Sequence, residues 1–287
     1  MCGFPLIHLD RHLKRLVQEH RRFVAMCEEF KLPEGGFTRR VTRILTPGTL
    51  VDETFVNQSD NNFLLAISEP TGDSESPSVG VAWIDVSSGD FFFQQTTISA
   101  LHDDLARLSP REVVLHKSLE DQPNHPIRLL LAEESLIVSY SSLDGTLDVV
   151  PQITPNTDDI TPHQPHSTNY TDPESSAIKL LSHFLRSNLM EYMPRQISTP
   201  VRQSLVSRMQ IDANTIRSLE IREGLREGGA KGSLLSVLKR TVTTSGTRLL
   251  ARWICKSASC GSESSLMTPS QVPQALPFQK STLDKAW

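Results

Sequence analysis

Short apolar runs alternate with helical stripes between residues 63 and 140, and this alternation constrains the fold more than any other feature. Two of the runs flank the turn residues Ser88 and Gly89, which predicts a β-hairpin over Val79–Thr97. In chain order the expected elements are strand Phe63–Ser68, that hairpin, helix Ser99–Leu108, strand Glu112–Lys117, helix Pro126–Glu134 and strand Leu136–Tyr140. This order predicts an α/β unit, a mixed sheet with helices packed on it.

The N-terminal segment reads as a helix followed by extended chain. Apolar residues recur at helical spacing from Leu6 to Val17, and the apolar run Phe23–Phe30 has the length of a strand. Proline and glycine at 33–36 break this run, and a second extended stretch ends at Pro47 and Gly48.

Residues 151–175 contain five prolines and almost no large apolar side chains, so they predict a flexible linker that cannot offset the entropy of ordering. Helical patterns follow it. An apolar stripe runs from Ala177 to Leu185, Asp212 is placed to cap a helix, and further helical runs end at Ile254. From residue 257 the periodicity stops, and the Ser-, Pro- and Gln-rich residues 257–287 predict a disordered tail.

The net charge of −4 hides three segments of different sign. Residues 1–45 hold 9 basic and 5 acidic residues, residues 46–175 hold 4 and 21, and residues 176–287 hold 16 and 7. The acidic middle repels phosphate backbones, which favours a protein-contact or spacer unit there. The basic ends suit nucleic acid, although solvated helix faces have the same composition.

Composition excludes several classes of protein. The chain is 38% hydrophobic over 287 residues, enough to bury a core, and it has no run near the ~18 apolar residues of a membrane helix. No signal peptide is expected. Its four cysteines are too few for a disulfide scaffold, and Cys255 and Cys260 lack the two-residue spacing of a zinc knuckle. Reduced thiols predict a location inside a cell or organelle.

Two segments suggest ligand sites that their residues do not support. The glycine-rich run Gly224–Ser233 has the glycine spacing of a phosphate-binding loop, but Ala230 stands where the lysine belongs and no strand precedes it. It is better interpreted as a turn between helices. His163 and His166 could bind a metal, but they lie in the predicted linker without a rigid frame or carboxylate support.

A two-metal nuclease of the ribonuclease H type is the main alternative function. Asp85 stands near the end of a predicted strand beside a glycine turn, and such chemistry needs several carboxylates converging on paired metals. Glu112 lies on another strand and Asp103 and Asp104 on a helix, so their convergence is not forced by the pattern. A non-catalytic sheet with solvent-facing acids is the favoured explanation of these residues, and no Ser-His-Asp, Cys-His or zinc-helix motif indicates another enzyme.

Several motifs, in order, resemble the MutS family of DNA mismatch-repair proteins. The run RRVTRILTPGTLVDE (Arg39–Glu53) with NNFLLAI (Asn61–Ile67) resembles the family's passage from the mismatch-binding domain to the connector domain. The matching segments downstream are VGVAWIDVSSGDF and LARLSPREVVLHK of the connector, then MQIDANTIRSLEI and GSLLSVLKRTVTTSGTRLLARWI of the helical core. The sequence of these motifs is most similar to the fungal mitochondrial branch of the family. The resemblance therefore implies a mitochondrial location, with the nucleus as the alternative.

The resemblance also marks what the chain lacks. The family's Phe-x-Glu mismatch-reading motif does not precede Met1, and no Walker motifs of its ATPase domain follow Ile254. We therefore expect a fragment, from a truncated gene model or a splice product, that is no enzyme and binds neither ATP nor Mg²⁺, the cofactors of the full-length family. The resemblance implies a ribonuclease H-like connector used for communication rather than cleavage, and a MutS-type dimer partner.

The expected fold is thus an α/β connector followed by a partial all-α core. The domain boundaries are 1–45 for the end of the mismatch-binding domain, 46–150 for the connector, 151–175 for the linker, 176–256 for the start of the core and 257–287 for the tail. The family binds mismatched duplex DNA, and in this chain Lys14, Arg15, Arg39 and Arg40 are the candidates for weak phosphate contacts. A stand-alone protein-interaction module is a further alternative, and no membrane partner is expected.

Overall fold

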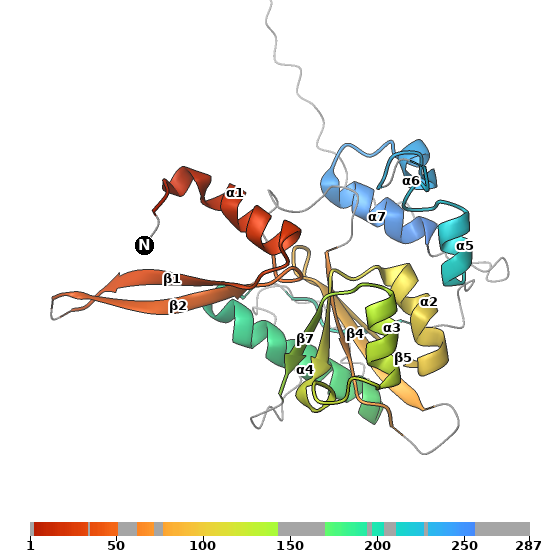
Figure 1. Ribbon diagram of the computed structural model, residues 1–287, viewed down its shortest axis with the longest axis horizontal. Coiled ribbons are helices and arrows are strands. Elements are labelled where there is room, and N and C mark those ends of the chain that lie inside the picture. Colours follow the sequence, from red (N-terminus) through yellow and green to blue (C-terminus); the bar gives the residue numbers. More distant parts are fainter. Residues whose placement is uncertain are drawn as a thin grey trace, which may run out of the picture.

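The computed structural model describes residues 3–33, 35–50, 62–71, 77–142, 170–193, 197–203, 211–226 and 229–255. They form three parts, which we call the N-terminal unit (3–50), the sheet unit (62–142 with 170–203) and the C-terminal helices (211–255) (Figure 1). The predicted linker histidines His163 and His166, the tail 257–287, Cys2 and Cys260 lie outside the described residues.

The N-terminal unit is a helix laid beside a long hairpin. Its helical turns are η1 (Leu6–His8), α1 (Leu9–Lys14) and η2 (Arg15–Glu19), and its strands are β1 (Val24–Lys31) and β2 (Phe37–Leu45). The strands pair antiparallel from Val24 opposite Leu45 to Lys31 opposite Phe37. A small core that includes Leu13, Val17 and Leu45 joins helix and hairpin, which confirms the predicted order of helix and strands.

Six strands form the mixed sheet at the centre of the protein, in the order β7-β6-β3-β4-β5-β8. The pairs β3–β4 and β4–β5 are antiparallel, whereas the pairs β3–β6, β6–β7 and β5–β8 are parallel. The strands are β3 (Phe63–Ile67), β4 (Ser78–Asp85), β5 (Asp90–Thr97), β6 (Glu112–His116), β7 (Val138–Ser141) and β8 (Val201–Arg202). The predicted hairpin is β4–β5, and the mixed α/β class is confirmed.

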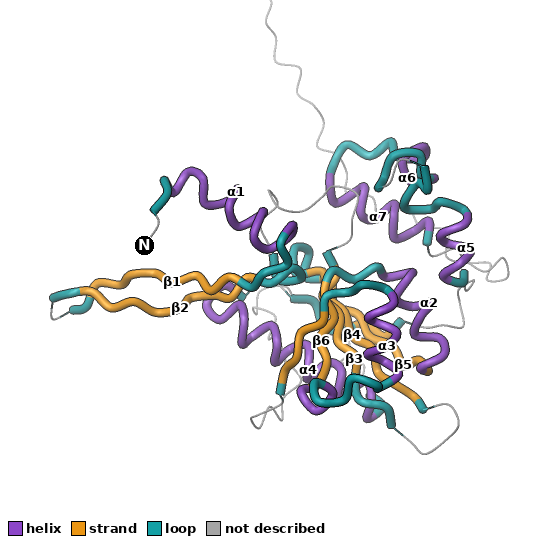
Figure 2. Tube along the Cα trace, viewed as in Figure 1, coloured by secondary structure: helices purple, strands orange, loops and turns teal. Residues whose placement is uncertain are grey.

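Helices cover both faces of this sheet (Figure 2). One face carries α2 (Ile98–Leu108) and α3 (Pro126–Glu133), preceded by η3 (Lys117–Leu119), and it buries Leu65 and Trp83. The opposite face carries α4 (Asp172–Leu189), continued by η4 (Met190–Tyr192), and it buries Leu64 and Ile84. Because successive side chains of a strand point to opposite faces, strands buried on both sides must be apolar at nearly every position, as β3 and β4 are.

The position of α4 corrects two expectations. The helix begins at Asp172, inside the residues 151–175 predicted as linker, because Thr171 and Glu174 form a capping box there. Its apolar stripe packs on the sheet, with Ala177, Leu181 and Leu185 in one core with strand residues, and so does not start a separate helical core. The apolar stripe of α4 is buried against the face of the sheet that α2 and α3 do not cover.

The C-terminal helices are α5 (Ala213–Ser218), α6 (Leu234–Leu238) and α7 (Thr244–Ile254). Asp212 caps α5 as predicted, since its side chain accepts a hydrogen bond from Thr215 N at 3.3 Å. Their shared core is small and centres on Ile216, Ile221 and Cys255. Among the helices of the described ranges, none is both long and apolar enough to cross a bilayer.

Candidate functional site

The passage from the N-terminal unit to the sheet unit is built around a buried carboxylate. Glu112, at the start of β6, is fully buried. Thr46 Oγ1 and Gly48 N donate to its Oε2 at 2.5 and 2.8 Å, and Ser139 Oγ of β7 donates to its Oε1 at 2.5 Å. One side chain therefore ties the turn after β2 to two strands of the sheet.

The Thr-Pro-Gly-Thr sequence at 46–49 is shaped for this contact. Thr49 Oγ1 accepts from Thr46 N at 2.8 Å, which closes the turn. A Cβ atom on residue 48 would lie 2.8 Å from Leu64 Cδ1 and 2.9 Å from Glu112 Cβ, so only glycine allows this approach. The turn 46–49, which is part of the motif that resembles the family, thus supplies the hydrogen-bond donors for the buried carboxyl group of Glu112.

Burial raises the pKa of Glu112, and the hydrogen bonds from Ser139, Thr46 and Gly48 offset only part of that increase. Desolvation penalises the ionised form, while donors pointing at the carboxylate favour it. Glu112 is therefore a pH-sensitive structural group.

Arginines of α7 join the C-terminal helices to the end of the β4–β5 hairpin. Arg248 Nη1 donates to Asp85 Oδ2 at 3.2 Å and to Ser87 Oγ at 2.6 Å. One helical turn later, Arg252 Nη1 lies 3.5 Å from Asp90 Oδ2. Asp85 thus holds a helix rather than standing open to a substrate.

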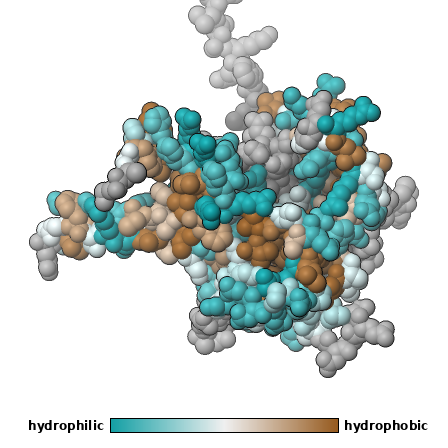
Figure 3. Space-filling view, viewed as in Figure 1, coloured by the Kyte–Doolittle hydropathy of each residue, from teal (hydrophilic) through white to brown (hydrophobic). Residues whose placement is uncertain are grey.

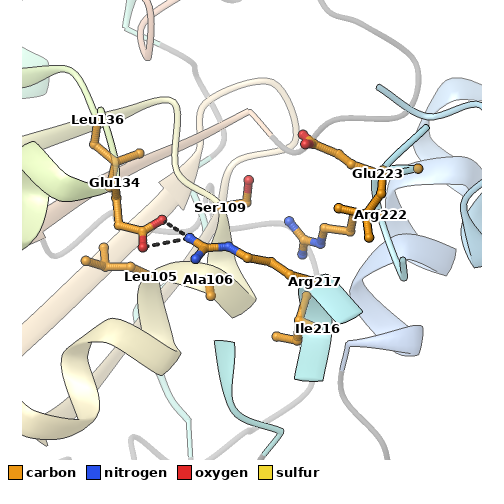
Figure 4. A pocket seen from close by; sticks show the side chains of 11 residues that line it. Leu105, Ala106, Ser109, Glu134, Leu136, Ile216, Arg217, Arg222 and Glu223 are labelled. Carbon is orange, nitrogen blue, oxygen red and sulfur yellow. Dashed lines mark hydrogen bonds and ion pairs between the residues drawn. The ribbon is translucent and has the colours of Figure 1, made fainter. Parts of the chain in front are cut away.

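A second contact joins α5 to the helices on the sheet (Figure 4). Arg217 Nη2 donates to both carboxylate oxygens of Glu134, at 2.7 and 2.5 Å, and His102 Nε2 lies 2.8 Å from Glu134 Oε1. Asp103 of α2 accepts a hydrogen bond from Ala213 N at the start of α5, at 2.9 Å.

A cavity of about 500 Å³ lies beside this contact, between the sheet unit and the C-terminal helices. Arg217 extends from α5 to Glu134, and Arg222 and Glu223 lie on the side of the C-terminal helices (Figure 4). Arg222 Nη2 also donates to the carbonyl of Arg107 at 2.6 Å. Two glutamates and two arginines balance the charge of the lining, and most of its other residues are apolar, which suits an interdomain joint.

Partial burial by itself raises the pKa of Glu134, but the hydrogen bonds and charges of Arg217 and His102 outweigh it and the pKa is lowered. The ionised form of Glu134 is the form that holds α5. Acid therefore weakens this contact.

We expect Glu134→Gln to remove an acid-sensitive contribution to stability. A carboxyl group whose folded-state pKa is lowered stabilises the fold above its unfolded value, here 4.5, and loses that effect as the pH falls through the folded value. The melting temperature of the wild type should exceed that of the variant at about pH 7, and the gap should close below about pH 4. Circular dichroism melts measure it, with the exposed neighbour Glu133→Gln as control. A gap that stays constant into acid would contradict this assignment.

The carboxylates of the nuclease alternative do not converge. Asp85 pairs with Phe63 and Glu112 pairs with Leu64, and these neighbours on β3 face opposite sides of the sheet. Asp85 and Glu112 therefore point to opposite faces and cannot share a metal pair. Within the residues that the structure describes, no group of three or more His, Cys, Asp or Glu could hold a metal ion.

The glycine-rich run between α5 and α6 is a turn that uses its own polar groups. Gly224 N donates to Gly229 O at 2.9 Å, and Ser233 Oγ caps α6. A Cβ on Gly224 would lie 2.3 Å from Lys231 O. The described residues of this run thus form a turn between helices, as the sequence predicted.

The predicted phosphate-contact residues are exposed on the N-terminal unit. Lys14 and Arg15 lie where α1 meets η2, and Arg39 and Arg40 lie on β2. Arg39 pairs with Glu29 at 2.9 Å, Arg15 lies 3.6 Å from Glu19, and the guanidinium of Arg40 lies 4.1 Å from the ring centre of Phe30. Because neighbouring residues of a strand face opposite sides, Arg39 and Arg40 do not act as one patch.

Sequence reasoning missed the arginine contacts of the C-terminal helices. Arg217, Arg248 and Arg252 are ordinary helix residues in the sequence, and Glu134 and Asp90 are ordinary acids. The available signal was the opposite charge of the two segments, which predicts attraction between them but not the partners.

A mixed sheet tied on one side to a hairpin unit and on the other to a set of helices defines a multidomain protein built around a connecting α/β domain. Family models describe the same three parts: MutS domain I matches residues 1–54, domain II matches 62–144 and domain III matches 214–257. The chain belongs to the MutS family of DNA mismatch-repair proteins, as its motifs predicted.

Bacterial relatives named "DNA mismatch repair protein MutS" match across these parts. The protein of Nitrobacter hamburgensis is 30% identical over 274 residues, that of Granulibacter bethesdensis 31% over 272 and that of Clostridium perfringens 30% over 270. Each match covers 88% of this chain and 28, 26 and 27% of the relative, respectively. The chain thus spans between a quarter and a third of the length of these relatives.

Proposed function

We propose that this chain contributes the interdomain coupling element of a mismatch-repair protein, with the sheet unit as the connector. The observation that carries the proposal is that one sheet is bonded to both neighbours, through Glu112 to the turn 46–49 and through Asp85 to Arg248. β3 alone separates the strands that carry these two acids. A displacement of the N-terminal unit would therefore be transmitted across one strand to the C-terminal helices.

Hydrogen exchange of the whole chain tests this coupling. Thr46→Val removes one donor to Glu112, and we expect faster exchange both in β6 and in α7 (Thr244–Ile254). Thr71→Val, an exposed position at the far end of the sheet, serves as the matched control. Faster exchange confined to β6 and the N-terminal unit would show that the joints are independent and would refute the coupling role.

The relatives are named for DNA mismatch repair. Of that activity, we propose for this chain only contacts with the DNA backbone. Lys14, Arg15, Arg39 and Arg40 are exposed cations on the N-terminal unit, which suits phosphate contacts that read no bases. The nuclease reading has no such support, because its acids face opposite sides of the sheet.

We expect weak binding that does not distinguish a G·T mismatch from a matched duplex. Replacing Arg39 and Arg40, or Lys14 and Arg15, by glutamine should weaken both complexes equally and lower the salt slope by about 0.9 for each phosphate that is no longer neutralised. Fluorescence anisotropy over a salt series measures this, with the exposed pair Lys117→Gln and Lys231→Gln as control. Tenfold tighter binding of the G·T duplex by the unmodified chain would contradict the expectation.

Finer parts of the assignment are supported by resemblance and topology. The sheet with helices on both faces suits a ribonuclease H-like connector, and α5 to α7 suit the beginning of an all-α core. We propose the connector to be 46–142 together with α4, the end of the mismatch-binding domain to be 1–45, and the core to begin near 211. The fungal mitochondrial branch, a mitochondrial location and a MutS-type dimer partner remain proposals that rest on the motifs.

Binding of ATP and Mg²⁺ is proposed to be a property of the full-length family and not of this chain. The turn 224–233 supports this, since Gly224 N bonds to Gly229 O and Ser233 N bonds to Ala230 O within it. Calorimetric titration with Mg-ATP tests it, and micromolar affinity would refute it.

A further inference from the structure

Three arginines of the C-terminal helices are covered by carboxylates of the sheet unit. Arg217 pairs with Glu134, Arg248 with Asp85 and Arg252 with Asp90. In each pair the cation belongs to the basic segment of the chain and the anion to the acidic one. The cover is uneven: the side chain of Arg217 is 54% exposed, whereas that of Arg248 is 11% exposed.

The carboxylates that cover these arginines do not occupy every hydrogen-bond donor of the guanidinium groups. Arg248 makes both its contacts through Nη1, and its Nε is buried without an acceptor among the described residues. Arg252 reaches Asp90 through one nitrogen at 3.5 Å. A guanidinium group is a planar fork that binds a carboxylate or a phosphate best through two nitrogens, so both arginines keep capacity for a better anion.

The arrangement of the arginines favours a polymeric anion. Arg248 and Arg252 are four residues apart on α7, on one side of the helix and about 6 Å apart along its axis. Duplex DNA carries about one negative charge for each 1.7 Å of its axis, a denser row of anions than three separate carboxylates. The Arg217–Glu134 and Arg252–Asp90 pairs are partly exposed, and such pairs contribute little to stability, so a polyanion can displace them. The Arg248–Asp85 pair is nearly buried and becomes accessible to the polyanion only after the other two pairs have opened.

We propose that Arg217, Arg248 and Arg252 are phosphate-binding residues masked by the sheet unit, so that a nucleic-acid backbone and the carboxylates of that unit compete for the same guanidinium groups. This goes beyond the coupling role: contact with DNA would free the C-terminal helices from the sheet. The three acids then act as an autoinhibitory cover that stands in for phosphate.

Removing two of the covering charges tests the competition. Asp90→Asn with Glu134→Gln conserves side-chain shape and leaves Asp85, which also bonds to Ser87, in place. At about 0.15 M salt, where screening extends over roughly 8 Å, we expect this variant to bind a labelled matched duplex about fivefold more tightly than the unmodified chain. Adding Arg217→Gln and Arg252→Gln, which replace the two arginines that these acids cover, should abolish the gain and lower the salt slope by about two.

Glu120→Gln with Asp121→Asn is the matched control. These exposed acids follow β6 at the opposite end of the sheet and carry the same total charge. Equal tightening by this control, or a gain that survives the arginine replacements, would overturn the proposal. Since the cover variant could lose its fold, Asp90→Asn and Glu134→Gln are also tested singly, with circular dichroism to verify folding. If neither folded single variant binds the duplex more tightly than the unmodified chain, the proposal is overturned.

Discussion

Replacing Glu112 with leucine is expected to lower the free energy of unfolding by about 3 kcal/mol. The substitution leaves Gly48 N without its acceptor in a fully buried place, and a buried donor left unpaired costs about 1–3 kcal/mol. The hydroxyl groups of Thr46 and Ser139 lose the same acceptor. Denaturant unfolding followed by circular dichroism measures the loss.

Glu112→Gln is the matched control, because its amide oxygen can accept from Gly48 N and its amide nitrogen can donate to Ser139 Oγ. We expect it to fold with little loss. A raised folded-state pKa means that Glu112 contributes fully below its unfolded value, 4.5, and that this contribution is lost as the pH rises through the folded value. The stability of the wild type relative to Glu112→Gln should therefore fall as the pH rises above about 4.5. An increase over that range would contradict the assignment.

Replacing Gly80 with alanine should be comparably severe, with a loss of about 3 kcal/mol from overpacking. The added Cβ would lie 2.0 Å from Pro173 O and 2.3 Å from Pro173 C, in the first turn of α4. These are backbone atoms, so no side-chain rotation relieves the clash and the helix must shift from the sheet. Unfolding measures the loss, and hydrogen exchange should be faster in α4 (Asp172–Leu189).

Gly3→Ala is the control for that substitution, because nothing lies within 4 Å of its added Cβ. A loss below about 0.5 kcal/mol for Gly80→Ala, the range of ordinary surface changes, would show that α4 does not approach the sheet as described.

The hairpin of the N-terminal unit leaves apolar side chains at the surface, among them Phe23, Phe37 and Val41, which are 54, 66 and 42% exposed (Figure 3). The two-stranded sheet packs against α1, and its strands also meet η4, where Tyr192 Oη donates to Glu28 Oε1 at 2.8 Å and the guanidinium of Arg43 lies 4.6 Å from the Tyr192 ring centre. Its fold therefore depends on α1, on η4 and on the turn at Glu112.

The strands and helices of the sheet unit follow from the sequence because each buries a face whose spacing is local. Apolar residues at every position of Phe63–Ile67 predict a strand covered on both sides, and a stripe at helical spacing predicts α2. The capping of α5 by Asp212 is equally local. The motif 46–49 also identified the family before any contact was known.

The sequence alone did not determine which residues far apart in the chain contact one another. Glu112, Asp85 and Glu134 look alike as acids near the ends of elements, yet one is buried by a turn 64 residues away, one holds a helix 163 residues away and one receives Arg217. For the same reason, the sequence did not determine that the apolar stripe of α4 packs on the sheet and not in a helical core. Periodicity specifies that a face is buried or a charge is paired, whereas the identity of the partner depends on strand order and register, and these exist only in the folded chain.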